Sequence, residues 1–162
     1  MDLNYEIEVI EYSKEALESA AVIFREYANS LDVDLCFQGF DQEMSHLAIV
    51  YAKPKGCILL AKYQDDVIGG VALKQIGEGV SEMKRLYVKP KFRGFGIAKS
   101  LVDSLIQKAK EANYSIIKLD TLSTMTAAIA LYTSFGFVPT GQYVHNPIET
   151  ALFFELDLTK NK

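Results

Sequence analysis

The stretch from Glu82 to Ala98, which reads EMKRLYVKPKFRGFGIA, decides the fold. Its first half alternates in the way of a strand, and Pro90 ends that pattern, so a strand is predicted over 80–88. Gly94 and Gly96 follow, and an amphipathic helical pattern begins there. The first N–H groups of a helix lack intrahelical partners, and the helix dipole adds partial positive charge at that end. A strand, a glycine loop and a helix in this order therefore predict a phosphate or pyrophosphate site.

The spacing of the loop residues separates the kinds of phosphate site. A dinucleotide fingerprint needs a third glycine where Lys99 stands, and the P-loop pattern G-x-x-x-x-G-K-[ST] is absent. The pattern Q/R-x-x-G-x-G/A is present, filled by Arg93, Gly96 and Ala98. This spacing resembles the acetyl-CoA loop of the GNAT superfamily of N-acetyltransferases.

Two further segments strengthen the resemblance. Residues 85–88 read RLYV directly before the loop, and residues 128–132 read AIALY some forty residues after it. Together with Phe135-Gly136-Phe137, the second segment resembles the family's A-x-x-L-Y … G-F block. The resemblance covers residues 82–137 in the family's order, whereas the first 55 or so residues resemble the family only in a general way.

The resemblance implies an α/β (α+β) fold, the GNAT acyl-CoA N-acyltransferase fold. We expect a mixed sheet of about seven strands with about four helices, in the order βααβββαβαββ, splayed open near its middle. The length and the absence of linkers or repeats predict one domain over 1–162. Strands are predicted over 5–12, 57–63, 67–75, 80–88, 116–121, 137–144 and 150–158, and helices over 14–28, 41–51, 96–112 and 125–135.

The resemblance makes acetyl-CoA the expected cosubstrate. The backbone amides of residues 93–98 would hold the pyrophosphate, and Arg93 would add charge. Leu86 and Val88 would offer backbone groups to the peptide-like pantetheine arm, in the manner of an added strand. The expected cofactor-binding set is Leu86, Val88, Arg93, Gly94, Phe95, Gly96, Ile97 and Ala98.

Three residues are predicted to act in catalysis. The resemblance makes the Leu86 amide an oxyanion donor to the thioester carbonyl and Tyr132 the acid that protonates the departing CoA thiolate. The family often has Asn seven residues before this tyrosine, and here Met125 stands there, which puts that cofactor contact in doubt. By period-two alternation Glu82 is placed on the face of Leu86 and Val88, where it would accept the amine's proton.

The general base and the acceptor stay open. Glu82, His145 and water are the candidates for the base, and the alternative for Glu82 is an exposed strand charge paired with a lysine. Candidates facing the acceptor are Phe37, Gln38, Phe40, Tyr143, His145 and Asn146. A small amine, an amino acid, an antibiotic and a protein amine all remain as acceptors. A non-catalytic CoA-binding or sensory module on the same fold is the alternative function.

Composition excludes other classes. A net charge of −4 disfavours a general nucleic-acid binder. The sequence contains no run of 18 apolar residues, so no membrane span is predicted. No Cys/His spacing suggests a metal site, and Cys36 and Cys57 suggest no disulfide framework. The expectation is a cytoplasmic, metal-free enzyme. Many family members are dimers, so a homodimer is considered.

Overall fold

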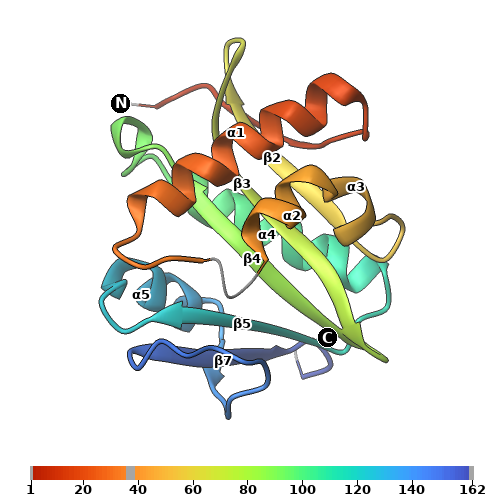
Figure 1. The fold of residues 1–162 in the computed structure, drawn as a ribbon, viewed down its shortest axis with the longest axis vertical. Coiled ribbons are helices and arrows are strands. Elements are labelled where there is room, and N and C mark those ends of the chain that lie inside the picture. Colours follow the sequence, from red (N-terminus) through yellow and green to blue (C-terminus); the bar gives the residue numbers. More distant parts are fainter. Residues whose placement is uncertain (1, 36–38, 161–162) are drawn as a thin grey trace.

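The structure is a computed structural model, and it describes residues 2–35 and 39–160. These residues form one mixed seven-stranded sheet in the order β1-β2-β3-β4-β5-β7-β6 (Figure 1). The strands are β1 (Glu6–Val9), β2 (Cys57–Tyr63), β3 (Asp66–Gly77), β4 (Val80–Val88), β5 (Ile116–Leu122), β6 (Val138–Pro139) and β7 (Ala151–Asp157). All neighbours are antiparallel except β4 and β5, which are parallel.

Helices cover both faces of the sheet (Figure 1). They are α1 (Lys14–Ser30), α2 (Phe40–Ser45), α3 (Leu47–Val50), α4 (Ile97–Glu111) and α5 (Thr126–Ser134). The first three pack with one buried apolar cluster, and α4 and α5 pack with a second one on the opposite face. We call these the α1 face and the α4 face. No helix of the described ranges is long and apolar enough to cross a membrane.

The predicted fold class is confirmed, with one helix divided in two. The helix expected over 41–51 is interrupted at His46, whose backbone leaves the helical region. The Ser45 hydroxyl donates to the Asp41 carbonyl, and His46 Nδ1 bonds the Gln42 carbonyl. Side chains that satisfy the last carbonyls in this way compete with continued helix. Gly39 caps α2, so the helix begins one residue before the expected start.

Two predicted strands are shorter in the structure. The first is confined to Glu6–Val9, and of the strand expected over 137–144 only Val138–Pro139 pairs in the sheet. Pro139 has no N–H to donate, which limits pairing there. Residues 140–150, the 140–150 loop, leave the sheet instead and cross its surface, where two long-range side-chain hydrogen bonds hold them.

A β-bulge in β4 decides which side chains reach the site. On β3, Gly70 pairs with Tyr87 and Ala72 pairs with Lys84. Two residues of β4, Arg85 and Leu86, therefore lie opposite the single β3 residue Val71. Arg85 has φ of 66°, a left-handed backbone that is rare for a residue with a side chain. Because one residue is added, the alternation of faces reverses across the bulge.

The bulge corrects the predicted placement of Glu82. Met83 and Val88 belong to the α4-face cluster and Leu86 packs against it, whereas Tyr87 belongs to the α1-face cluster. Glu82 alternates with Met83 and therefore lies on the α1 face, opposite Leu86 and Val88. Strict period-two alternation fails because the bulge adds one residue to β4. The sequence did not predict this, since nothing near Arg85 indicates a positive φ.

Candidate active site

The sheet opens between β4 and β5. Their parallel pairing covers only three pairs, from Val80 with Ile116 to Glu82 with Lys118. Beyond them each strand continues, β4 to Val88 and β5 to Leu122, without pairing to the other. The splay that the family resemblance implied is therefore present, and it is seen in Figure 1 as the widening space between the two labelled strands.

Two concave regions meet at this opening. The first, here the glycine-loop groove, has a volume of about 590 Å³, within the range of small-molecule sites. It runs from the loop at Arg93–Lys99 past Leu86 and Val88 to the start of α5. The second, here the inter-strand pocket, lies between β4 and β5. Tyr27, Leu86 and Met125 line both, so the two regions are continuous.

The glycine loop has the backbone that its sequence predicts. Gly94 and Gly96 have φ of 89° and 80°, and a Cβ at either would meet no atom within 4 Å. Gly96 caps α4 with no side chain bonded to the first-turn amides. The N-terminus of a fifteen-residue helix therefore opens onto the groove, and such an end attracts anions.

The predicted cofactor-binding residues differ in what they present to the groove. Leu86, Val88, Arg93, Gly94, Gly96, Ile97 and Ala98 line it. Phe95 does not, and its ring is exposed, so only its backbone belongs to the loop. Arg93 Nε donates to the Val88 carbonyl at 2.8 Å and its guanidinium lies 5.6 Å from the Tyr87 ring centre. Arg93 thus ties the loop to the end of β4 as well as lining the groove.

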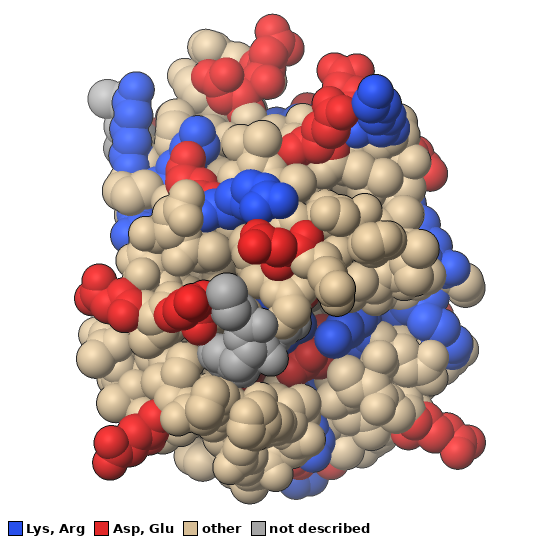
Figure 2. All heavy atoms as spheres, in the orientation of Figure 1, with Lys and Arg blue, Asp and Glu red and all other residues tan. Residues whose placement is uncertain are grey.

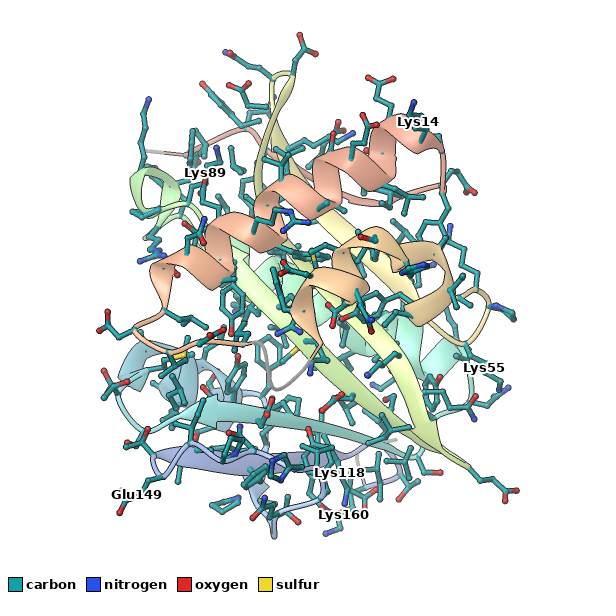
Figure 3. The ribbon with its side chains drawn as sticks, viewed as in Figure 1. Lys14, Lys55, Lys89, Lys118, Glu149 and Lys160 are labelled. Carbon is teal, nitrogen blue, oxygen red and sulfur yellow. The ribbon has the colours of Figure 1, made fainter. Side chains whose placement is uncertain are left out.

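Six basic residues lie between Lys84 and Lys99, here the basic run, and they do not form one cationic surface. They are Lys84, Arg85, Lys89, Lys91, Arg93 and Lys99. Arg85 is buried and bonds both carboxylate oxygens of Glu43, at 3.0 and 2.9 Å. Lys89, labelled in Figure 3, pairs with Glu26 at 3.5 Å. Lysines, arginines and carboxylates are interspersed on the face seen in Figure 2. Only Arg93 and Lys99 of this run line the glycine-loop groove.

Tyr132 lies at the opening between β4 and β5. It is buried, lines the inter-strand pocket and packs against Phe137, with ring centres 5.8 Å apart. Its hydroxyl makes no hydrogen bond within the described residues, and because no fully buried side-chain atom there lacks a partner, the hydroxyl oxygen keeps some exposure. Burial raises the pKa of Tyr132, and nearby Tyr27 and Asp120 act in the same direction. The hydroxyl therefore keeps its proton at neutral pH.

Glu82 is buried and already engaged. Its side chain is 2% exposed, and Oε2 accepts a hydrogen bond from the Tyr143 hydroxyl at 2.6 Å. Its other oxygen lies 3.8 Å from Lys74 Nζ and 3.9 Å from Lys84 Nζ. Of the alternative for Glu82, the exposed position is therefore wrong, whereas the pairing with a lysine is present. Glu82 does not line the inter-strand pocket, which leaves it without direct access to a ligand there.

The carboxylate that lines the inter-strand pocket is Asp120, which sequence reasoning missed. It follows Lys118 by two residues on β5, so it shares the α1 face with Glu82. Asn146 Nδ2 donates to Asp120 Oδ2 at 3.0 Å and itself lines the pocket. The signal available in the sequence was a carboxylate in a mostly apolar strand, although that strand also carries Lys118.

The other candidates for the acceptor side divide into residues that lie at the opening and residues that do not. Tyr143 and Asn146 reach the opening and hold the 140–150 loop over it. His145 is exposed and lines neither region, and Phe40 is buried under the Arg85 guanidinium, 5.1 Å away. Phe37 and Gln38 lie outside the described residues. Met125 lines both regions and its sulfur accepts from Thr121, so it brings no amide to the groove.

Comparison with known proteins identifies the family of the chain. Residues 17–137 match the Acetyltransferase (GNAT) family, and the protein belongs to that family. An uncharacterized N-acetyltransferase of Schizosaccharomyces pombe is 38% identical over 146 residues, which cover 89% of this chain and 90% of the relative. The N-acetylaspartate synthetase of Danio rerio is 35% identical over 124 residues, covering 70% of this chain but 44% of the relative.

Solved structures share this fold. An acetyltransferase from Streptococcus agalactiae has a TM-score of 0.79 at 20% identity, covering 95% of this chain and 98% of that one. A Bacillus anthracis protein described as a streptothricin acetyltransferase, in complex with acetyl coenzyme A, has a TM-score of 0.58 at 29% identity, covering 67% and 68%. The chain is an N-acetyltransferase, and the non-catalytic alternative is not favoured.

Proposed function

We propose that this protein transfers the acetyl group of acetyl-CoA to a primary amine by direct attack within a ternary complex. The observation that carries the proposal is the meeting of two regions at Leu86. A groove that ends at a glycine-capped helix N-terminus joins a pocket that holds an unpartnered tyrosine hydroxyl and a carboxylate. The acetyl-CoA bound in a related structure supports the same cosubstrate here.

In the proposed reaction, the glycine-loop amides bind the pyrophosphate and the free edge of β4 binds the pantetheine arm. The amine nitrogen forms a bond to the acetyl carbon, while the Leu86 amide donates to the carbonyl oxygen that gains charge. The carbon–sulfur bond then breaks, and its electron pair stays on sulfur. Tyr132 gives that sulfur its proton and later regains one from solvent. The products are the N-acetylated amine and free CoA thiol.

The nitrogen must lose a proton, because a free primary amine is mostly protonated at neutral pH. We assign the accepting group to Asp120, directly or through a water molecule, since it is the described carboxylate that lines the pocket. Glu82, by contrast, supports the site from outside it through Tyr143. Direct attack is also consistent with Cys57, whose pKa burial raises to about 11 and which lines neither region.

The test is a screen of primary amines with acetyl-CoA, following release of free thiol and the mass of the acetylated product. We expect thiol release that depends on the amine. Asp120→Asn is expected to lower kcat/KM at neutral pH, with recovery as rising pH deprotonates the amine in solution. The two carboxylates are distinguished by measuring kcat/KM from pH 6 to 10 for Glu82→Gln and for Asp120→Asn. Recovery confined to Glu82→Gln would return the base to Glu82.

A further inference from the structure

Lys84 and Asp120 face each other across the opening of the sheet. The last pair of the parallel ladder is Glu82 with Lys118. Lys84 and Asp120 each lie two residues beyond it, on the same face, and the β4 bulge begins only after Lys84. A cation and an anion therefore stand at one level on opposite walls, and both line the inter-strand pocket. Among the described residues no ion pair joins the two side chains, so the Lys84 ammonium nitrogen and the Asp120 carboxylate oxygens lie more than 4.0 Å apart.

Lys84 is an unusual lysine. Its side chain is only 10% exposed, yet its ammonium makes no hydrogen bond within the described residues. Its one ionic contact, to Glu82 at 3.9 Å, is shared with Lys74 at 3.8 Å. Two ammonium groups thus share one carboxylate. Burial lowers the pKa of Lys84, partly offset by Glu82. A buried ammonium with three unused donors is suited to an anionic ligand.

The neighbouring arginine does not compete for that ligand. Arg85 already binds both oxygens of Glu43, and Tyr51 donates to the same carboxylate at 2.9 Å. Asp120 is likewise oriented by Asn146. The rest of the pocket lining is mixed, because Tyr27, Thr121 and Tyr132 carry hydroxyls. One part of it, here the apolar wall, is formed by Leu31, Val33, Leu35 and Ile148. The pocket therefore offers one positive group, one negative group and an apolar wall.

From this arrangement we propose that the acceptor is a free α-amino acid, or a close analogue, with an apolar side chain. Its amine lies toward Asp120 and Leu86, and its carboxylate lies on Lys84. The apolar wall receives its side chain. A protein lysine or an N-terminal residue has no carboxylate next to the amine, so neither satisfies Lys84. The proposal rests on the proposed function, because it names the acceptor of the same site.

The experiment compares L-leucine with L-leucinamide, which keeps the amine and the side chain but lacks the negative charge. Rates are expressed per free amine, since the two amines titrate differently. For the wild type we expect kcat/KM to favour L-leucine by at least about 10-fold, on the scale of one charged hydrogen bond. Lys84→Met is expected to remove this preference through a higher KM for L-leucine. Lys84→Arg, which keeps the charge, should retain most of it.

Lys74→Met is the matched control, because Lys74 contacts the same Glu82 oxygen but does not line the pocket. It should keep the preference for L-leucine. Melting temperatures of the variants establish that each is folded. Equal use of the amide by the wild type, or an unchanged preference in folded Lys84→Met, would overturn the proposal.

A different result marks failure of the proposed function. In that case no amine, with or without a carboxylate, releases thiol, although CoA binds. The acceptor proposal is then decided by calorimetry with CoA present. L-Leucine should bind more tightly than L-leucinamide, and binding of neither, or of both equally, overturns it.

Discussion

At the scale of single residues, Tyr132 gives the most direct test of catalysis. Phenylalanine keeps the ring against Phe137 but removes the proton that sulfur needs. We expect Tyr132→Phe to lower kcat by roughly 10- to 1000-fold, the range of a general-acid contribution, with CoA affinity almost unchanged. Tyr114→Phe is the control, because Tyr114 is a buried tyrosine that lines neither region and donates to the Lys55 carbonyl. Equal activities of the two variants would show that the thiolate leaves unaided.

The raised pKa of Tyr132 adds a pH prediction. Burial disfavours the phenolate, so the acid form persists above pH 10, where an exposed tyrosine loses its proton. The wild-type kcat should therefore show no fall between pH 9 and 10 that Tyr132→Phe lacks. A fall near pH 10 in the wild type alone would mean that the tyrosine titrates as an exposed group.

The pair of Glu43 and Arg85 determines a second pH dependence. Burial raises the pKa of Glu43, but the Arg85 guanidinium and the Tyr51 hydroxyl outweigh it, and the net pKa is lowered. The pair's contribution to stability is therefore present above the unfolded carboxyl's pKa and lost as pH falls through the lower folded value. We expect Glu43→Gln to be less stable at neutral pH and to lose less stability than the wild type on acidification to pH 3. Urea unfolding at each pH measures this.

At the scale of elements, the cap of α4 is the feature to perturb. Gly96→Glu places a negative side chain where the pyrophosphate is proposed to bind, and calorimetry should detect no CoA binding. Gly39 offers a matched control, since it caps α2 with the same left-handed backbone and open space around a Cβ. Both variants should be destabilised by about 1–2 kcal/mol, but Gly39→Glu should keep its affinity. Tight CoA binding to folded Gly96→Glu would place the cofactor elsewhere.

The elements also show how far sequence reasoning reaches. The strand over 80–88 and the helix after it were predicted almost to the residue, because alternation, Pro90 and the glycines act locally. The bulge at Arg85 was not predicted, and it moved Glu82 to the other face. The side chain at the bulge is held by a long-range contact that no local pattern encodes, because Arg85 bonds Glu43, 42 residues away.

The site was predicted to a similar extent. The glycine loop, Leu86 and Tyr132 were found because they carry the family's local spacing, and they line the two joined regions. Their catalytic and binding roles remain predictions. Asp120 and Lys84 were not singled out as pocket groups, because only the opening of the sheet brings β4 and β5 residues to face one another. The path of the 140–150 loop depends on Tyr143 and Glu82, which are 61 residues apart.

At the scale of the whole molecule, the opening joins two parts of the sheet by a short ladder. The glycine-loop groove is lined by residues of α1, β4, α4 and α5, so acetyl-CoA should contact both parts of the sheet. Saturation at about 100 times Kd would stabilise the fold by ~2.7 kcal/mol, which corresponds to a rise in Tm of roughly 5–10 °C for a chain of this size. Thermal unfolding with and without CoA measures it, and Gly96→Glu should show no rise.

The two regions at the opening have a consequence for kinetic order. The glycine-loop groove lies beside the start of α4, whereas Lys84 and Asp120 line the adjoining inter-strand pocket, so the proposed sites of the two substrates are adjacent but different. Two different sites allow both substrates to be bound at the same time, as the proposed ternary complex requires. We therefore expect intersecting lines in double-reciprocal plots, with CoA competitive against acetyl-CoA and the acetylated product competitive against the amine. Parallel lines would instead indicate an acetylated enzyme and would contradict the proposed direct attack.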